Sequence, residues 1–381
     1  MPFLRSASLA AVALSFAAPA FAEVPAKQLF GAKRDAAALQ PAVYGSYSKG
    51  CVAGAARLPD DGPTWQAMRL SRNRHWGHPA AVELTKRLSR DGRKVGWNGL
   101  LVGDLTQPRG GPMLTGHQSH QAGLDVDIWL TPMPNRRLSA KERETLSATS
   151  MLKRVDGKLT NQQIDKSKFT DAHAGIIRTA AQYPEIERIF VHPTIKREMC
   201  ERYPDRPAWL SKVRAQWKHH YHMHLRLGCP ADSPGCKPQR AVPNDGCGET
   251  LDWWFKVAYG PKPKPTKKAA SAKMKAAKTK RTRRYRTLSQ LPAACRVVLN
   301  APSYDGLGAA PQARAAGASS LAGISYVPRA RPDALDPIGD LIAPVAAPNV
   351  KAGDGMRRPP AGVGEVADPF AADAIAVSPS H

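Results

Sequence analysis

The stretch YHMHLRL (residues 221–227) alternates polar and apolar side chains. His222, His224 and Arg226 fall on one side of an extended chain, and the residues between them fall on the other. The alternation predicts a β-strand that packs its apolar side into a core. The residues just before it, His219 and His220, bring four of the chain's 11 histidines into this one segment.

A second alternating stretch, LDVDIWL (124–130), lies far upstream and places Asp125 and Asp127 on one face. It follows GHQSHQAG (116–123), in which Gly123 predicts a turn after His120. His120 and Asp127 can therefore converge from two sides of a bend, and a histidine of the 221–227 strand would complete a His₂Asp set. Catalytic zinc sites use three such ligands and leave a fourth position for water. The alternative is a histidine-rich surface beside an ordinary half-buried strand.

The types of side chain in these two stretches favour zinc as the metal. Imidazole and carboxylate ligands without a thiolate suit zinc, although they also bind other divalent ions. The chain lacks an HExxH motif, because Gln118 and Ser119 separate His117 from His120. It also lacks GxSxG. A thermolysin-type site and a serine nucleophile elbow are therefore not expected.

The N-terminus, MPFLRSASLAAVALSFAAPAFAEVPA, has the organisation of a secretory signal peptide. A basic Arg5 precedes an apolar run, and Ala20-Phe21-Ala22 is a small-residue cleavage site. We expect residues 1–22 to be removed and the protein to work in the periplasm. The alternative, a short membrane anchor, would need a longer apolar run. We expect no transmembrane segment in the mature chain.

The six cysteines have an even count, which in an oxidising compartment predicts three disulfides. Six cysteines allow fifteen pairings, and their spacing does not choose among them. A zinc cluster is the alternative, but none of the cysteines forms a CxxC pair.

Composition divides the chain into a globular part and a polar remainder. Residues 23–258 hold most of the apolar residues and predict one catalytic domain. A basic low-complexity linker (259–290) follows, with twelve Lys and Arg and no acid between residues 262 and 286. A short apolar island (291–300) carries Cys295, and a Pro/Ala-rich tail (301–381) is predicted to be disordered.

The basic run could be a solvated linker, or it could draw the protein to anionic envelope surfaces. Nucleic acid is not an expected partner of an exported protein. The net charge of +25 fits an acidic substrate only in a general way.

The pair SHQAGLDVDIWL (119–130) and HHYHMHLRLGCPADS (219–233) resembles the penicillin-insensitive murein endopeptidases. These are related to zinc D-Ala-D-Ala carboxypeptidases, D-Ala-D-Ala dipeptidases and hedgehog-type domains. Four further stretches carry the same resemblance: GSYSKGCVAGAARLP (45–59), GLLVGDLTQPRGG (99–111), RIFVHPTIKREMC (188–200) and NDGCGETLDWWF (244–255). The resemblance covers residues 40–258 and the island with Cys295, and leaves out the basic run and the tail.

The resemblance implies an α+β fold with a central antiparallel sheet and flanking helices. It implies zinc bound by His120, Asp127 and His224, with His222 as the catalytic base and His219 beside it, stabilising the oxyanion. His117 and Asp156 also match metal-binding positions of the family. A family histidine that follows this aspartate by three residues is replaced here by Leu159, so a second metal is in question. The implied disulfides are Cys51–Cys295, Cys200–Cys247 and Cys229–Cys236.

The implied activity is hydrolysis of the D-alanyl–diaminopimelate cross-links of peptidoglycan. Such a metallopeptidase does not acylate a serine, so penicillin would not block it. Two alternatives remain: a zinc D,D-carboxypeptidase or dipeptidase that trims stem peptides, and a non-catalytic peptidoglycan-binding module.

Overall fold

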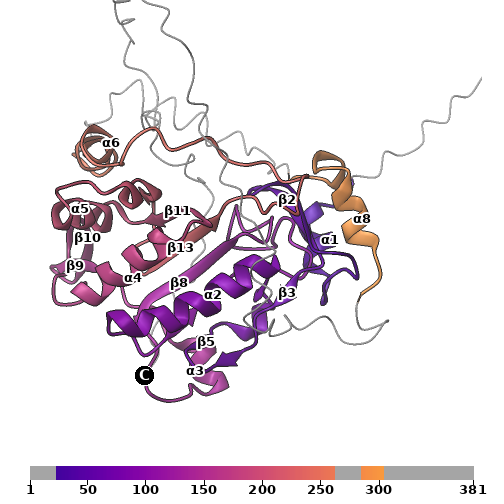
Figure 1. The fold of residues 1–381 in the computed structure, drawn as a ribbon, viewed down its shortest axis with the longest axis horizontal. Helices are drawn as coiled ribbons and strands as arrows, with labels where there is room; N and C mark the ends of the chain where they lie inside the picture. Colours follow the sequence, from indigo (N-terminus) through magenta and orange to yellow (C-terminus); the bar gives the residue numbers. More distant parts are fainter. Residues whose placement is uncertain (1–22, 262–284, 304–381) are drawn as a thin grey trace, which may run out of the picture.

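A computed structural model describes residues 23–261 and 285–303 of the chain (Figure 1). The predicted signal peptide, nearly all of the basic run and the tail from residue 304 lie outside the described residues, so those interpretations stay predictions. The described residues combine a central sheet with flanking helices, which confirms the predicted α+β class. None of the described helices is long and apolar enough to cross a membrane.

The central sheet has seven strands in the order β12-β11-β13-β8-β7-β5-β4. The pairs at its centre are antiparallel, as expected, but β12 pairs with β11 and β5 pairs with β7 in parallel, so the sheet is mixed. Each parallel pair is joined through a helix, because parallel neighbours need a crossover connection. The strands are β4 (Asp61–Gly62), β5 (Trp65–Ala67), β7 (Leu100–Val102), β8 (Asp125–Pro132), β11 (Ile186–Val191), β12 (Val213–Ala215) and β13 (His222–Leu227).

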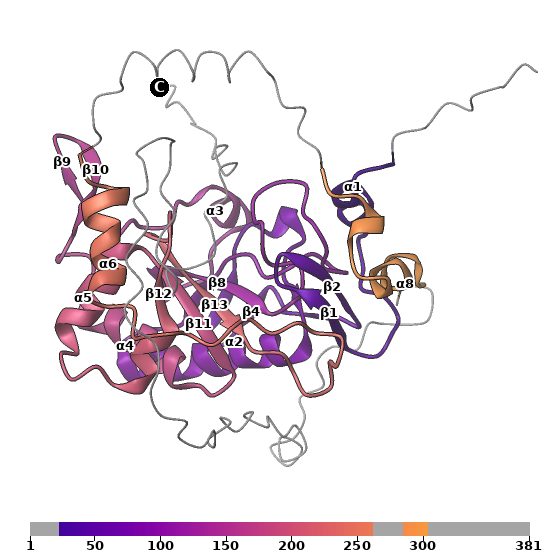
Figure 2. The same cartoon turned by 90° about the horizontal axis from the view of Figure 1, so that it is seen from above.

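The helices α2 (Pro79–Asp91) and α4 (Asp171–Gln182) cover one face of this sheet (Figures 1 and 2). The sequence starts α2 sharply: Pro79 occupies its first turn and the His78 side chain accepts a hydrogen bond from the Ala80 backbone N–H. Buried residues of both helices form one core with Met223 and Leu225 of β13. The predicted apolar face of the 221–227 strand therefore packs on the helices, and its histidine face points to the opposite side of the sheet.

The remaining elements are short. Three strand pairs lie outside the central sheet, namely β1 (Ala42–Ser46) with β2 (Lys49–Ala53), β3 (Ala56–Arg57) with β6 (Trp76–Gly77), and β9 (Leu152–Val155) with β10 (Lys158–Ile164). The other α-helices are α1 (Ala26–Gly31), α3 (Ala140–Thr145), α5 (Pro193–Arg202), α6 (Glu249–Trp253) and α8 (Ala294–Asn300). Single turns of 3₁₀ helix are η1 (Leu70–Arg72), η2 (Gly92–Val95), η3 (Ala208–Lys212) and η5 (Leu288–Gln290), and η4 (Trp254–Ala258) is a π-helix.

The three disulfides have the pairing that the resemblance implied. Cys51 is bonded to Cys295, Cys200 to Cys247 and Cys229 to Cys236. The first of these closes 244 residues of sequence and attaches α8 to β2. Closing so long a loop restrains the unfolded chain, an effect typically worth a few kcal/mol.

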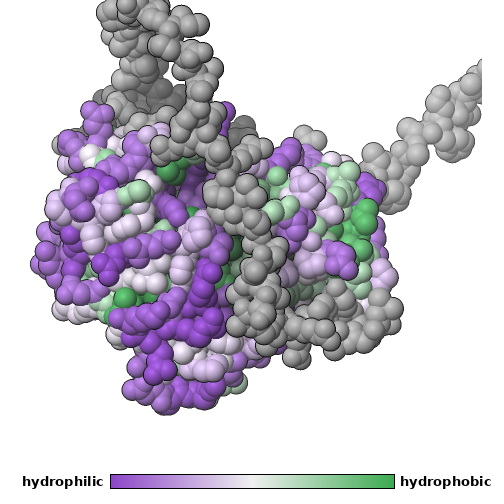
Figure 3. All heavy atoms as spheres, in the orientation of Figure 1, coloured by the Kyte–Doolittle hydropathy of each residue, from purple (hydrophilic) through white to green (hydrophobic). Residues whose placement is uncertain are grey.

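The island at 291–300 packs against the N-terminal part of the chain. Residues of α8, α1 and β2 form a second, smaller core that is separate from the main one. Figure 2 shows α8 beside α1, β1 and β2. The face shown in Figure 3 is mostly hydrophilic, with a hydrophobic area over α8, where Val297 is 63% exposed.

One buried side chain, Arg109, holds the end of α8 in place. Its guanidinium donates hydrogen bonds to the backbone carbonyls of Val298, Leu299 and Ala301 at 2.7–2.9 Å. These are carbonyls that a helix end leaves without partners of its own. Arg109 therefore caps α8 from a loop that is distant in sequence.

We predict that Arg109→Ala lowers the free energy of unfolding by about 3 kcal/mol, because it leaves buried carbonyls without a donor. Urea denaturation under non-reducing conditions measures this. Arg93→Ala, which removes an exposed arginine, serves as the control and should change stability little. Equal losses in the two variants would contradict the capping role.

Candidate metal centre

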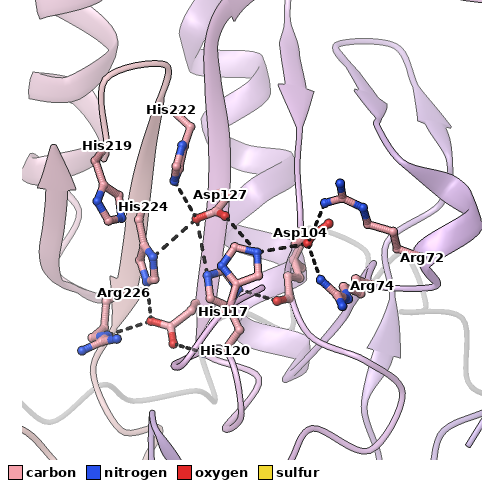
Figure 4. Close-up of polar contacts among 12 residues, drawn as sticks. Arg72, Arg74, Asp104, His117, His120, Asp127, His219, His222, His224 and Arg226 are labelled. Carbon is pink, nitrogen blue, oxygen red and sulfur yellow. Dashed lines mark hydrogen bonds and ion pairs between the residues drawn. The ribbon is translucent and has the colours of Figure 1, made fainter. Parts of the chain in front are cut away.

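The histidine face of β13 meets the aspartate face of β8 across an antiparallel pair. The register places His224 opposite Asp127 and Arg226 opposite Asp125. Side chains directly opposite each other on one face of such a pair lie about 5 Å apart at Cβ. The two alternating stretches of the sequence therefore bring their polar side chains together in the middle of the sheet (Figure 4).

A tight bend brings His120 onto the same face. His120 itself has a left-handed backbone, with φ of 63°, and its N–H donates to Asp125 Oδ2 at 2.8 Å. Gly123 completes the bend with φ of 72°, and a Cβ there would lie 3.0 Å from the His78 backbone nitrogen. Only glycine fits this position without strain. The predicted turn between His120 and Asp127 is thus confirmed.

The hydrogen bonds fix which ring nitrogen of each histidine carries the proton. His120 Nδ1 lies within hydrogen-bond distance of the Leu105 carbonyl, and His224 Nε2 lies 2.8 Å from Asp125 Oδ1. A carbonyl and an ionised carboxylate can only accept, so these two nitrogens must donate. In the neutral rings the opposite nitrogens, His120 Nε2 and His224 Nδ1, therefore present lone pairs.

Both lone pairs point at the same carboxylate oxygen. Asp127 Oδ1 is 3.4 Å from His120 Nε2 and 3.4 Å from His224 Nδ1. Among the described residues, neither His120 Nε2 nor Asp127 Oδ1 has a hydrogen-bond donor, although both are buried. Three buried acceptors that face one another repel unless a cation lies between them.

The distance of 3.4 Å from Asp127 Oδ1 to each of the two histidine nitrogens is that between ligands around one small ion. Bonds of about 2.0–2.1 Å at the tetrahedral angle separate two ligand atoms by about 3.3 Å. The outer nitrogen of each ring is held by a carbonyl or a carboxylate, which is the usual way in which proteins orient metal-binding histidines. The residues present therefore fit a divalent metal ion.

His117 adds a further imidazole at the edge of this cluster. His117, His120 and Asp127 offer ligand atoms within 4.8 Å of one another and form a candidate metal-binding triad. In the described arrangement, however, His117 Nε2 lies 3.0 Å from Asp104 Oδ2 and 3.6 Å from Asp127 Oδ2. Because Asp104 can only accept, this nitrogen donates to it. His224, whose inward nitrogen is free of such a bond, is the better placed third ligand.

Burial shapes the protonation of the cluster. Burial lowers the pKa of His222. Burial also lowers the pKa of His224, to about 4, although the nearby charge of Asp125 opposes this in part. Burial also disfavours a charge on His120, but the carboxylate of Asp127 outweighs this and raises the pKa of His120. Burial alone would raise the pKa of Asp127, but the surrounding imidazoles outweigh it and hold this pKa well below its usual value. The cluster therefore favours positive charge at its centre, between His120 and Asp127.

His222 and His219 lie next to each other beside the cluster. His222 Nε2 is 3.7 Å from Asp127 Oδ1, and the rings of His219 and His222 are 4.8 Å apart at their centroids. The backbone carbonyl of Trp217 accepts a hydrogen bond from His219 Nδ1. Burial, reinforced by the neighbouring imidazoles, keeps the pKa of His219 well below its usual value, so its ring is neutral and its Nε2 is an acceptor.

The structure does not bring Asp156 to the cluster. Asp156 lies in the exposed turn between β9 and β10, whereas the cluster is buried in the central sheet. Leu159 of the same hairpin lines a separate cavity of about 440 Å³, together with Asn161 and Tyr259. Leucine offers no ligand atom there, so the hairpin contributes at most the Asp156 carboxylate.

Two buried aspartates that were not predicted from the sequence support the cluster. Asp104 accepts from His117 and Arg74, and Asp125 accepts from His224 and Arg226. For Asp125 a signal existed, because it shares the alternating face of Asp127 two residues away. For Asp104 there was none, because its partners are distant in sequence: two arginines lie 30 or more residues upstream, and His117 lies further along its own loop.

Fold and site together define an α+β protein whose central sheet carries a buried His–Asp cluster with the spacing of metal ligands. The profile of the penicillin-insensitive murein endopeptidases matches residues 43–300. The chain therefore belongs to this peptidase family, which confirms the resemblance seen in the sequence.

Individual relatives agree. The penicillin-insensitive murein endopeptidase of Haemophilus influenzae is 42% identical over 221 residues, which are 58% of this chain and 74% of the relative. Those of Salmonella heidelberg and Salmonella typhimurium are each 41% identical over 224 residues, which are 58% of this chain and 78% of the relative.

We predict that Asp127→Asn lowers the affinity for zinc by at least about a hundredfold, because it removes the only charged ligand. Asp156→Asn makes the same chemical change at the exposed hairpin and should leave the affinity unaltered. Competition with a chromophoric chelator measures both. Comparable losses would place the ion, or a second one, at the β9–β10 hairpin.

His224→Ala and His117→Ala distinguish the two possible third ligands. In the same competition measurement we expect the larger loss of zinc affinity from His224→Ala.

Proposed function

We propose that this chain is a zinc-dependent endopeptidase that hydrolyses the D-alanyl–diaminopimelate cross-links of peptidoglycan and is insensitive to penicillin. Membership of the family supports the peptidase activity and the murein substrate. The observation that carries the zinc dependence is that His120 Nε2 and His224 Nδ1 each lie 3.4 Å from Asp127 Oδ1, a buried oxygen without a hydrogen-bond donor among the described residues.

His120, Asp127 and His224 would hold the zinc ion in this proposal. Zinc supplies Lewis-acid chemistry, which polarises a scissile carbonyl and makes water nucleophilic near neutral pH. We propose a single zinc site, since Leu159 removes a histidine ligand from the β9–β10 hairpin.

His222 would act as the general base. Its ring is neutral because burial lowers its pKa, so it can accept a proton from the attacking water and return it to the leaving amine. It lies beside the ligand oxygen of Asp127, at 3.7 Å, where a water between ligand and base would be within reach.

The tautomer of His219 argues against the oxyanion role expected for it. Its Nδ1 proton is donated to the Trp217 carbonyl, so the neutral ring has no N–H left for an oxyanion. Its Nε2 can instead accept a proton. We therefore propose that His219 assists His222 in handling protons rather than stabilising negative charge.

The predicted export of the chain completes the proposal. Three disulfides are typical of an oxidising compartment, and they support a periplasmic location after removal of residues 1–22. The cross-linked peptides of the murein layer would then be accessible to the enzyme.

We predict that the purified protein converts cross-linked muropeptide dimers to monomers in the presence of zinc. A chelator should stop the reaction, renewed zinc should restore it, and penicillin should leave it unchanged, because no serine is acylated. Chromatography of the products measures this. Intact dimers with a zinc-loaded protein would contradict the endopeptidase activity, and linear stem peptides would then test the trimming alternative.

We predict that His222→Ala retains zinc but lowers kcat by about 10²–10⁴-fold, the usual contribution of a general base. His220→Ala is the matched control, since His220 bonds to Ser150 and lies outside the cluster. Full activity of His222→Ala would refute the assignment. His219→Ala should reduce kcat less than His222→Ala.

A further inference from the structure

Arg72 lies at the border of the metal centre on a firmly anchored loop. Arg72 ends η1, and the preceding residue, Ser71, bonds to the Glu144 carboxylate through both its backbone N–H and its hydroxyl at 2.9 Å. Arg69, at the start of the loop, places its guanidinium 5.2 Å from the centre of a Trp129 ring. Trp129 shares the polar face of β8 with Asp127, so the loop borders the face of the sheet that carries the cluster.

The charges around Asp104 do not require Arg72. The Asp104 carboxylate is buried and pairs with Arg74 at 3.0 Å, and it also accepts from His117 at 3.0 Å. The Arg74 side chain is only 10% exposed and is held further by the Thr115 carbonyl. Arg74 therefore neutralises Asp104, and Arg72, at 3.2 Å, is a second cation on one carboxylate.

The Arg72 guanidinium has hydrogen-bonding capacity left for a ligand. Its side chain is 47% exposed, and among the described residues Asp104 is the one side chain to which it donates a hydrogen bond. A guanidinium carries five N–H donors, and its fork geometry matches a carboxylate. Figure 4 shows Arg72 on the side of Asp104 that faces away from His120 and His224.

Tyr221, like Arg72, is partly exposed beside the cluster. Tyr221 is 37% exposed, and its ring lies 4.6 Å from the His222 ring, centroid to centroid. The cluster is therefore bordered by the partly exposed side chains of Tyr221, beside His222, and of Arg72, beside Asp104.

We propose that Arg72 forms a carboxylate-binding subsite beside the metal centre, which selects peptides with a free carboxylate next to the scissile amide. This inference rests on the proposed function. When one amine of diaminopimelate is acylated in a cross-link, the carboxylate on the same carbon is left beside the amide nitrogen. The excess positive charge at Arg72 is suited to that group, and a carboxamide in its place would lose the charge-assisted hydrogen bonds.

The test compares two cross-linked dimers that differ only in this carboxylate, which is free in one and a carboxamide in the other. We expect Arg72→Gln to lower kcat/KM at least about tenfold more for the free carboxylate than for the carboxamide. The loss should be mainly in KM. Arg72→Lys should recover part of the preference, because it keeps the charge but loses the fork. Arg137→Gln, at an exposed ion pair with Asp61, is the control and should match the wild type.

Other outcomes have separate meanings. Equal losses on both dimers, or no loss on either, would overturn the subsite. Lower zinc content in Arg72→Gln would instead indicate support of His117 through Asp104. If the wild type cleaves neither dimer, the proposed function fails. Calorimetric binding of the same two dimers then still tests the subsite, because loss of the preference for the free carboxylate in Arg72→Gln supports it and an unchanged preference refutes it.

Discussion

The register of β13 against β8 is the constraint on which the rest of the site depends. A shift of β13 by one residue would turn its histidines into the helix-covered core and expose Met223 and Leu225, and the same shift of β8 would bury its aspartates there. Either change would destabilise the fold, because the apolar face packs on α2 and α4 and the polar face holds charges that need partners. The hydrophobic core thus fixes the pairing, and the pairing sets His224 beside Asp127.

The loop between β7 and β8, which carries His117 and His120, is the second element on which the site depends. This loop is held at several points along its length. Arg109 ties it to α8, Arg74 holds the Thr115 carbonyl, and the Gly111 N–H donates to the Gln121 carbonyl at 2.9 Å. The disulfide between Cys51 and Cys295 fixes α8 in turn. This explains why the family profile extends to residue 300, well beyond the last residue of the cluster.

Much of this arrangement could be predicted from alternation alone. The two stretches at 124–130 and 221–227 predicted their strands and their faces, because a period of two is a local property. The turn at Gly123 predicted the convergence of His120 with Asp127. The pairing of the cysteines came from the resemblance, since spacing leaves fifteen possibilities. The parallel pairs at β12 and β5, the cap by Arg109 and the role of Asp104 were not predictable, because each depends on contacts between segments distant in sequence. The tautomer of His219 likewise depends on one backbone carbonyl that no pattern encodes.

The charges buried around the cluster favour a bound cation there, and this argument does not depend on the relatives. Three aspartates, at positions 104, 125 and 127, are buried around one point. Arg74 neutralises the first and Arg226 the second. Among the described residues, the third has only imidazoles as ion-pair partners. Burial lowers the pKa of His222 and His224, so their rings are neutral at pH 7, while the carboxylate raises the pKa of His120. A buried carboxylate without a cation is costly. Among the described residues, a guanidinium lies beside each neighbouring aspartate but none pairs with Asp127. A bound cation would balance that carboxylate, and the surrounding imidazole nitrogens suit a metal ion.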